Sequence, residues 1–572
     1  MANFYTDNKD LQFTLKNLDL DEACVIREDN YEFAKEFDTA PLDYADAKDN
    51  YDRVLEVIGE ICGDNIDPRS REVDEVGPHF ADGVVTYHEL TQKNISDLTQ
   101  AGVMGVMLPH KYGGLNFPVS IYTMMTEMVS RADASLQNLF GLQDIAETIS
   151  EFGSEEQKDE FLPRFATGEV DGSMDLTEPD SGSDLQSVRL KAWQDEKTGK
   201  WYLNGMKRFI TNGCAKVHLV LARSEEGTTD GRGLSMFVAE ACPELVVRRI
   251  EHKLGIHGVA TAELQYNDVP AQLCGQRRRG LTRYVMSLMN GARVAISGQA
   301  LGIAEAAFRE ARKYAEEREQ FKTSIDKFPA VYDMLTRMKS KVLAARCLLY
   351  ETTRAVDLRS GYNHVVEHGT DVDPETRKKA KYWNRVAAVL TPMSKALSTE
   401  ISNEVAYDSI QIHGGTGFMK DFNVERYYRD ARITNIYEGT TQLQVIAAIG
   451  GVMTRTNDVR LKELMALPFE GKLTRLKDKI VKKHERLLKA VKFVSDRKDS
   501  EYQGLMARAL VEMETMVFVG MLMLRDALKD SEREVLAERY ILDNVSMFEE
   551  RFMRVTSGDI TVIDNHRDII DY

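Results

Sequence analysis

The feature that most constrains the fold of this 572-residue chain is a change in hydrophobic period along it. Up to about residue 168, apolar residues recur at the spacing of amphipathic helices. From about 169 to 275 the pattern breaks into short strand-like pieces such as HLVLARS and LSMFVAE. Helical spacing returns at about residue 276 and continues to the end. This order of helices, strands and helices predicts an α+β fold that is mostly α.

Local signals sharpen this prediction. Residues 287–317, SLMNGARVAISGQALGIAEAAFREARKYAEE, are rich in helix formers and predict one long helix. Ser154 followed by Gln157 is a capping-box pattern, which predicts that a helix begins there. The dipeptides Asn204-Gly205 and Asn267-Asp268 favour turns between strands. We therefore expect the central strands to form an antiparallel sheet, folded as a small barrel or as an orthogonal sandwich.

The same changes of pattern give the expected domain boundaries. A polar, acidic segment with few periodic apolar positions comes first, and the tail after residue 452 differs in composition from the preceding helices. We expect an N-terminal extension, an N-terminal helical domain, a central β domain, a C-terminal helical domain and an appended helical domain. Their expected limits are 1–45, 46–168, 169–275, 276–452 and 453–572.

Composition excludes several classes of protein. The 74 Lys and Arg residues against 91 Asp and Glu give a formal charge of −17, which argues against binding to nucleic acid. The six cysteines are scattered without a C-x-x-C pair, and His252 and His257 are wrongly spaced for one helical face, so we expect no disulfide scaffold and no metal site. The apolar run 516–524 is too short to span a bilayer, which takes about 20 residues. We expect a cytoplasmic protein.

One segment that could carry chemistry is MDLTEPDSGSDLQ, residues 174–186. It crowds the hydroxyls of Thr177, Ser181 and Ser183 around Pro179 and Gly182. Such a segment can bind a phosphate or the polar edge of a planar ligand. On composition alone, a well-capped turn that enters the sheet is the favoured alternative.

A second segment is KRFITNGCAK, residues 207–216. Phe209 and Thr211 are two positions apart, so in a strand they face the same side. An aromatic ring beside a hydroxyl suits a conjugated heterocycle. The alternative is a strand that runs into a turn at Asn212-Gly213.

The third segment spans residues 411–444. Gly414, Gly415 and Gly417 allow close approach of a ligand to the backbone. Glu438 lies between Tyr437 and Gly439 in an otherwise uncharged stretch, and a desolvated carboxylate has a raised pKa and can act as a general base. The alternative is a glutamate that starts a helix, with glycine as a hinge.

Together these segments resemble the acyl-CoA dehydrogenase family. Five motifs match in the family's order and at its spacing, over roughly residues 50–452: LTEPDSGSD at 176–184, FITNG at 209–213, REQF at 318–321, QIHGG at 411–415 and YEGTTQ at 437–442. The resemblance implies an N-terminal helical domain, a β domain and a C-terminal four-helix bundle.

The resemblance also implies a reaction. Members bind FAD and dehydrogenate an acyl-CoA to the trans-2-enoyl-CoA, as in fatty acid β-oxidation, and pass the electrons to an electron-transferring flavoprotein. A glutamate at the position of Glu438 removes the α-proton, and the β-hydrogen leaves as hydride to flavin N5. The backbone N–H matching Glu438 and the ribityl chain of the flavin hydrogen-bond the thioester carbonyl and stabilise the developing enolate.

Residue by residue, the resemblance implies two sets of contacts. The cofactor contacts are Met174, Leu176, Thr177, Ser183, Phe209, Thr211, Arg318, Phe321, Gln411, Gly414, Gly415, Thr440 and Gln442. The substrate contacts are Ser183, Asn290, Arg293, Tyr437 and Gly439. Arg318, Gln411, Gly414 and Gly415 would reach the FAD of a neighbouring subunit, which implies a homodimer or a homotetramer.

The chain departs from the family pattern at several positions. Asn290 replaces a common Asp, Lys322 replaces a common Gly, and Pro329 replaces a common Gln, which puts one adenine contact in doubt. Ala292 cannot supply the base that some relatives carry nearby, which favours Glu438. An acyl-CoA oxidase that uses O₂ and a non-catalytic flavin-binding relative remain alternative functions, and the acyl group stays open.

The appended tail resembles that of longer family members, one type of which contacts membranes. The basic stretch 472–492, with Leu473, Leu476, Ile480, Leu487 and Val491 on one stripe, permits membrane-surface contact. The stretch lacks aromatic anchors except Phe493 at its end, so we favour a bundle helix packed on a second subunit, with its basic residues solvated or facing acidic ones.

Overall fold

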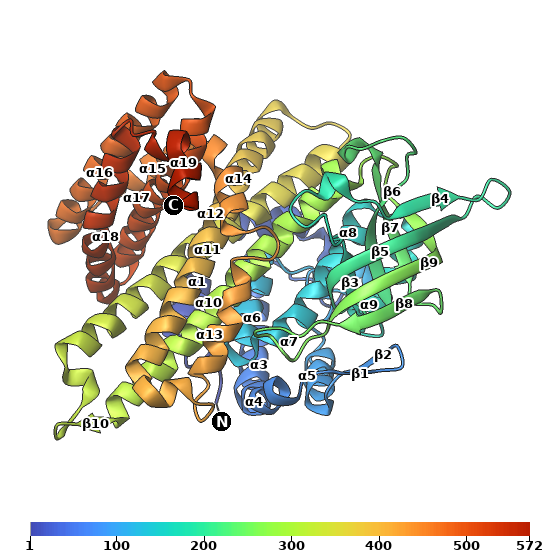
Figure 1. Ribbon diagram of the computed structural model, residues 1–572, viewed down its shortest axis with the longest axis horizontal. Coiled ribbons are helices and arrows are strands. Elements are labelled where there is room, and N and C mark those ends of the chain that lie inside the picture. Colours follow the sequence, from blue (N-terminus) through green and yellow to red (C-terminus); the bar gives the residue numbers. More distant parts are fainter. Residues whose placement is uncertain (1) are drawn as a thin grey trace. The chain divides into compact units, whose positions relative to one another are not determined.

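The computed structural model describes residues 2–572 and divides the chain into two compact units, Met1–Ile303 and Ala304–Tyr572 (Figure 1). The first unit begins with nine helices and a small hairpin. The helices are α1 Lys9–Asn17, α2 Asp21–Arg27, α3 Tyr44–Glu60, α4 Asp67–Val76, α5 Glu89–Gln100, α6 Val119–Ala132, α7 Ala134–Phe140, α8 Asp144–Phe152 and α9 Glu155–Ala166. The hairpin pairs β1 His79–Ala81 with β2 Val84–Thr86.

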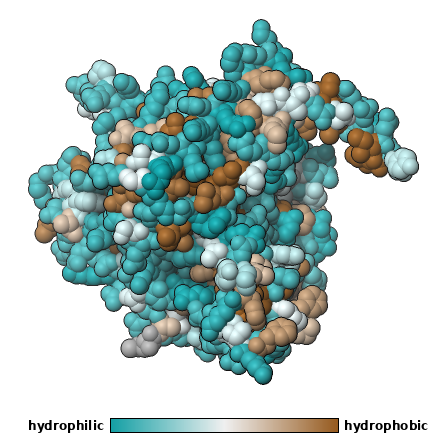
Figure 2. All heavy atoms as spheres, turned by 90° about the vertical axis from the view of Figure 1, so that its left-hand side faces the viewer, coloured by the Kyte–Doolittle hydropathy of each residue, from teal (hydrophilic) through white to brown (hydrophobic). Residues whose placement is uncertain are grey.

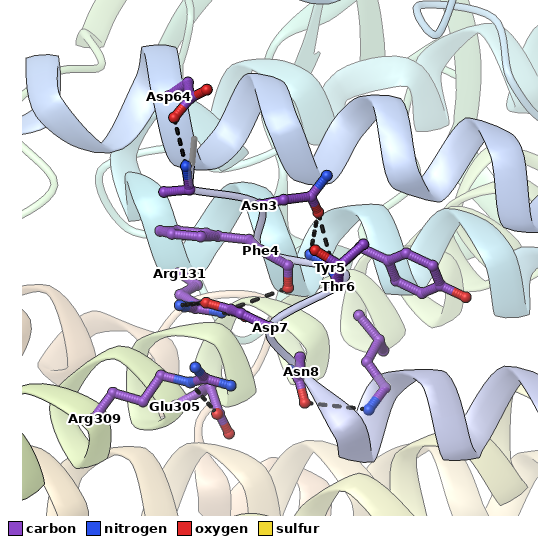
Figure 3. Close-up of polar contacts among 12 residues, drawn as sticks. Asn3, Phe4, Tyr5, Thr6, Asp7, Asn8, Asp64, Arg131, Glu305 and Arg309 are labelled. Atoms are coloured by element: carbon purple, nitrogen blue, oxygen red, sulfur yellow. Dashed lines mark hydrogen bonds and ion pairs between the residues drawn. The ribbon is translucent and has the colours of Figure 1, made fainter.

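The N-terminal extension is folded, although its sequence shows little periodicity. Leu11 and Leu15 of α1 are buried. Phe4 and Asp7, which precede α1, both contact Arg131 of α6. The Arg131 guanidinium donates hydrogen bonds of 2.7 and 2.6 Å to the two carboxylate oxygens of Asp7 and lies 3.6 Å from the ring centroid of Phe4 (Figure 3). The partner on α6 is distant in sequence, so hydrophobic period could not reveal this contact.

The capping box at the start of α9 is confirmed. The Ser154 hydroxyl accepts a hydrogen bond from the Gln157 backbone N–H at 3.3 Å, and the Gln157 side chain accepts one from the Ser154 N–H at 3.1 Å. Two orphan N–H groups of the first turn are thereby satisfied.

Seven strands form the central sheet of the first unit. They are β3 Gly172–Asp175, β4 Lys191–Gln194, β5 Trp201–Thr211, β6 Val217–Arg223, β7 Leu234–Glu240, β8 Leu245–Ile250 and β9 Thr261–Cys274. The order β6-β4-β5-β9-β7 closes because β7 pairs back onto β6, so of the two predicted forms the structure has the small barrel. Most pairs are antiparallel as predicted, but β6 runs parallel to both β3 and β4.

The predicted turns at Asn204-Gly205 and Asn267-Asp268 are wrong. β5 continues through Asn204 with a shift of register after Leu203, and β9 continues through Asp268, whose φ is 56°. A β-bulge accommodates such residues without ending the strand. The dipeptides therefore bend two long, paired strands instead of separating four short ones.

Long helices dominate from α10, Met286–Glu317, onward, and α10 confirms the long helix predicted at 287–317. The second unit continues with α11 Pro329–His368, α12 Pro374–His413, α13 Val424–Thr434 and α14 Thr441–Met453. α11 packs along α12, which also contacts α13 and α14. A short hairpin of β10 Glu319–Gln320 and β11 Thr323–Ser324 follows α10, and Pro329 opens α11.

The appended tail is helical as predicted. It comprises α15 Asp458–Met465, α16 Gly471–Arg497, α17 Ser500–Lys529, α18 Glu534–Thr556 and α19 Thr561–Asp571. The five predicted stripe residues of α16 are all buried, and α16 packs on α17 and α18 of the same chain. Lys472 pairs with Glu538 of α18 at 2.6 Å and Arg486 with Glu549 at 2.7 Å.

The apolar stripe of α16 is thus covered within the bundle and is not presented to a lipid surface. Hydrophilic side chains predominate on the face of the molecule seen in Figure 2. None of the helices among residues 2–572 combines the length and the apolar character needed to cross a bilayer.

Candidate active site

In the first unit, the structure brings the two predicted flavin-contacting segments side by side. The backbone N–H of Arg208 donates to the carbonyl of Thr177 at 3.0 Å, and the Ser173 hydroxyl donates to the carbonyl of Thr211 at 3.1 Å. These bonds tie β5 to β3 and to the chain that leaves it. Met174 and Thr177 are half-buried, whereas the side chain of Leu176 belongs to the apolar core.

A buried ion pair fixes the segment after β3. The Lys207 ammonium, fully buried in β5, donates to a carboxylate oxygen of Glu178 at 3.0 Å and to the carbonyl of Leu176 at 2.9 Å. The Glu178 carboxylate also accepts the backbone N–H groups of Arg189 and Leu190. Burial lowers the pKa of Lys207, an effect that Glu178 opposes. Both side chains therefore hold the shape of this segment.

Phe209 presents an exposed aromatic ring beside this segment. Its φ is 61°, the β5–β9 register shifts between Lys207 and Ile210, and 53% of its surface is exposed. Ile210 is buried, whereas Phe209 is exposed and Thr211 half-buried, which agrees with the prediction that Phe209 and Thr211 face the same side. The Arg208 guanidinium lies 4.7 Å from the ring centroid. An exposed ring next to polar groups fits a planar conjugated ligand.

The hydroxyl-rich segment forms a capped turn, as the favoured alternative predicts. The Asp184 carboxylate accepts hydrogen bonds from the Gln186 N–H at 3.2 Å and the Ser187 hydroxyl at 2.6 Å, which makes it the cap of a short helical turn. Ser183 next to it is exposed. Asp184 is thus structural, and Ser183 remains accessible to a ligand.

Of the predicted substrate contacts in this unit, Asn290 and Arg293 lie together on α10. The Arg293 guanidinium donates to the Asn290 side-chain oxygen at 3.1 Å. Leu288, two residues before Asn290, packs in the same apolar cluster as Leu176, which connects this end of α10 with the segment after β3.

In the second unit, the structure groups the residues predicted to reach a neighbouring FAD. Tyr314 near the end of α10 stacks on His413 at the end of α12, with 4.1 Å between ring centroids, and its hydroxyl lies 3.0 Å from that of Thr416. This stacking places the hairpin after α10 beside the end of α12. These predicted residues, Arg318, Gln411, Gly414 and Gly415, are exposed, as is Phe321, another predicted cofactor contact.

The surface around these residues is open. Gly414 ends α12 with a φ of 63°, and a Cβ added at Gly414 or Gly415 would meet nothing within 4 Å. Phe321 is 91% exposed. Phe321 and Lys322 both have positive φ at the tip of the hairpin, so Lys322 adopts the conformation that a glycine would take without strain. Bare backbone and an exposed ring fit a cofactor that approaches from outside.

The candidate base lies in the loop between α13 and α14. Glu438 and Gly439 have φ of 53° and 92°, and Glu438 is half-buried. The Lys395 ammonium donates to the carbonyls of Tyr437 and Gly439 at 2.6 and 2.5 Å. The Gln444 side chain donates to the carbonyls of Glu438 and Gly439 at 3.2 and 2.8 Å.

The interpretation of Glu438 as a helix-starting residue is wrong. α14 begins at Thr441, and Thr440 is its N-cap, accepting a hydrogen bond from the Leu443 N–H at 3.4 Å. Gln442, in the first turn, is exposed. Glu438 instead stands in a turn that its neighbours hold in a left-handed conformation, as is common for residues with a functional role.

Sequence reasoning missed Lys207, Lys395 and Gln444. Lys395 is the one charged residue in VAAVLTPMSKALST, the same signal that singled out Glu438. Lys207 and Gln444 lie inside the candidate segments 207–216 and 411–444, but the sequence of neither segment shows that their side chains bond to the main chain.

Comparison with known proteins assigns the family. Family models of acyl-CoA dehydrogenase match along the chain: the N-terminal domain at 49–169, the middle domain at 173–269, the C-terminal domain at 279–450 and a further acyl-CoA dehydrogenase C-terminal model at 454–541. The chain is 34% identical over 457 residues to 3-methylmercaptopropionyl-CoA dehydrogenase of Ruegeria pomeroyi, covering 74% of each protein.

Solved structures agree. Butyryl-CoA dehydrogenase from Megasphaera elsdenii is similar with a TM-score of 0.60 and 29% identity, over 71% of this chain and 98% of that one. An acyl-CoA dehydrogenase from Bacillus anthracis, solved with FAD, shares the fold with a TM-score of 0.75 and 22% identity, over 88% of each chain. The chain therefore belongs to the acyl-CoA dehydrogenase family, as an oxidoreductase with FAD as its cofactor.

Proposed function

We propose that this acyl-CoA dehydrogenase converts an acyl-CoA thioester to the trans-2-enoyl-CoA, with Glu438 as the base that removes the α-proton. The observation that carries the proposal is the loop of Glu438. Its carboxylate belongs to a half-buried residue whose backbone is held on both sides by hydrogen bonds from Lys395 and Gln444. A general base must be held within reach of the proton that it abstracts, and such a loop meets that need.

The proton, the electron pair and the hydride of this reaction can each be accounted for. The Glu438 carboxylate takes the α-proton and becomes a carboxylic acid, while the electron pair of the C–H bond forms the double bond to the β-carbon. The developing enolate oxygen is stabilised by the backbone N–H of Glu438. Bound FAD supplies the two-electron acceptor for the β-hydrogen, which leaves as hydride.

We assign the remaining predicted residues by the surfaces they form. The flavin ring is held by residues of the first unit: Met174, Thr177, Ser183, Phe209 and Thr211, with Leu176 contributing through its backbone. Thr440 and Gln442 add cofactor contacts. A neighbouring subunit's FAD would meet the exposed group Arg318, Phe321, Gln411, Gly414 and Gly415, in a homodimer or homotetramer. The acyl-CoA contacts are Ser183, Asn290, Arg293, Tyr437 and Gly439.

We further propose an electron-transferring flavoprotein as the acceptor, in fatty acid β-oxidation, and the five-domain division at 1–45, 46–168, 169–275, 276–452 and 453–572. The acceptor proposal has a direct test. Turnover that requires the flavoprotein and forms no peroxide in air would support it, whereas stoichiometric peroxide would identify an oxidase.

The test of the reaction is an anaerobic titration of the FAD-loaded protein with acyl-CoAs of different chain length, branching and terminal group. Loss of the flavin's visible absorption with one class would establish both reaction and substrate. Glu438→Gln should keep FAD and lower the bleaching rate by about 10²–10⁴-fold. Glu404→Gln, which removes an exposed carboxylate paired with Lys341 on α11, should bleach like the wild type.

Bleaching of Glu438→Gln at the wild-type rate would refute the base assignment. A yellow wild-type protein that no acyl-CoA bleaches would instead favour a non-catalytic flavin-binding role.

A further inference from the structure

Lys395 stands out among the lysines of the second unit because it is completely buried and turned onto the loop of the candidate base. Its ammonium donates to the carbonyl of Tyr437 at 2.6 Å and to the carbonyl of Gly439 at 2.5 Å. The two acceptors flank Glu438 on either side. A charged group removed from water is costly unless it is hydrogen-bonded, so these contacts demand a fixed geometry.

The geometry of the peptide bond gives this contact a consequence for the site. The peptide that joins Tyr437 to Glu438 is planar and trans, so its N–H points away from its C=O. Because Lys395 holds the Tyr437 carbonyl, it also sets the direction of the Glu438 N–H. The N–H is therefore aimed to the side of the loop opposite the ammonium.

We propose that Lys395 is a positioning residue that orients and polarises the Glu438 N–H as the donor to the substrate's thioester carbonyl. The inference rests on the proposed function and deepens it. An ammonium bonded to an amide oxygen draws electron density from the amide and strengthens its N–H as a donor, as in other cooperative hydrogen-bond chains. Lys395 thus acts on the developing enolate through one peptide unit.

Gln444 supports the same loop and shares the Gly439 carbonyl with Lys395, but it does not contact the peptide that carries the Glu438 N–H. Its side chain bonds the carbonyls of Glu438 and Gly439, which belong to the next two peptides along the chain. The left-handed conformation of Glu438 needs such anchors, because it is disfavoured in a residue with a Cβ, whereas Gly439 adopts its positive φ without that penalty. Gln444 therefore shapes the turn, and Lys395 in addition directs the donor.

The test uses Lys395→Met in the full-length, FAD-loaded protein. The probe is a 3-thiaacyl-CoA, whose β-sulfur blocks dehydrogenation but leaves the α-protons exchangeable. Its α-proton exchange with D₂O, followed by mass spectrometry, should fall by about 10- to 10²-fold, while its dissociation constant changes less. With a ¹³C-labelled thioester carbonyl, the shift of the infrared C=O band on binding should shrink, which a merely structural role would not cause.

The chain offers a matched control in Lys483. This lysine of α16 is also buried and donates to a backbone carbonyl, that of Ile541 at 3.2 Å, within the appended bundle. Lys483→Met should leave the exchange rate and the infrared shift unchanged. Gln444→Met should slow the exchange less than Lys395→Met does.

Wild-type exchange and an unchanged infrared shift in folded Lys395→Met would overturn the proposal. If that variant fails to load FAD, Lys395→Gln, which keeps a donor but loses the charge, is judged by the same two readouts. A wild-type protein that exchanges no α-protons would refute the proposed function itself, so the two failures are distinguishable.

Discussion

Two buried lysines, one in each unit, hold main chain at predicted site segments, and they do so differently. Lys207 in the barrel meets the Glu178 carboxylate as well as the carbonyl of Leu176. Lys395 in the helical unit donates to the carbonyls of Tyr437 and Gly439. The first lysine bonds to a side chain and to the main chain, whereas the second bonds to the main chain on both sides of Glu438.

The different partners give the two contacts different roles. An ion pair between side chains neutralises a buried charge, so its loss lowers the free energy of unfolding. A donor bonded to the carbonyls of a turn fixes the directions of those peptides. Its loss therefore affects any step in which their N–H groups take part. We therefore expect substitutions around Lys207 to change the free energy of unfolding, and those around Lys395 to change mainly the reaction.

Replacing the barrel lysine should have the largest effect on stability. Lys207→Met leaves the Glu178 carboxylate buried without its cation, which should lower the free energy of unfolding by about 3–5 kcal/mol. Urea unfolding followed by circular dichroism measures the loss. The double variant Lys207→Met, Glu178→Gln should recover part of it, since the uncompensated charge is gone. Equal instability of single and double variants would contradict this account.

Glu514 of α17 is the reverse case, because this buried carboxyl accepts a hydrogen bond from the Asn457 amide at 3.1 Å and not from an ammonium. Burial raises the pKa of Glu514 from 4.5 to about 7. A carboxyl with a raised pKa in the folded state stabilises fully below its unfolded pKa, and this stability is lost as the pH rises through 7.

Glu514→Gln should therefore raise the free energy of unfolding by about 3 kcal/mol at pH 8, and by much less at pH 5. Urea unfolding at both pH values measures the gain. An equal gain at the two pH values would show that packing, and not ionisation, is responsible. The difference between the two pH values therefore measures what a buried carboxylate costs when no lysine such as Lys207 lies beside it.

The parts of the fold that sequence predicted are those that local signals determine. The long helix α10 follows from uninterrupted helix formers, and α9 begins where Ser154 and Gln157 cap each other. The sequence wrongly predicts turns at Asn204 and Asp268, because whether such residues turn the chain or bulge a strand depends on the strand paired with them. The folded N-terminal extension was missed for the same reason, since its ties are long-range.

The candidate site divides in the same way. Glu438 could be singled out because a lone charge in an uncharged stretch is visible in the sequence. That the carbonyls on either side of it converge on Lys395 depends on how α12 packs against the loop. The sequence therefore indicates the proposed base, and the tertiary structure is needed to find Lys395, the residue proposed to orient its N–H.

Gly439 tests the conformation that Lys395 holds. Its φ of 92° is unfavourable for residues with a Cβ, so Gly439→Ala should strain the loop by about 1–3 kcal/mol and slow α-proton exchange by about tenfold. The control is Gly450→Ala in α14, where a Cβ meets nothing within 4 Å and alanine favours the helix. If both variants exchange α-protons at the wild-type rate, the positive φ is not needed for the reaction.

The smallest expected effect concerns two helix caps, one in each unit, of which one is also a proposed cofactor contact. Ser154 caps α9 and Thr440 caps α14, so Ser154→Ala and Thr440→Ala should each lower the free energy of unfolding by about 1 kcal/mol. Thr440 is also a proposed cofactor contact next to the Glu438 loop, whereas Ser154 is not. FAD titration of the apoprotein should therefore show weaker binding for Thr440→Ala alone, and Thr440→Ser should restore both cap and affinity. Equal FAD affinity in the two alanine variants would reduce Thr440 to a helix cap.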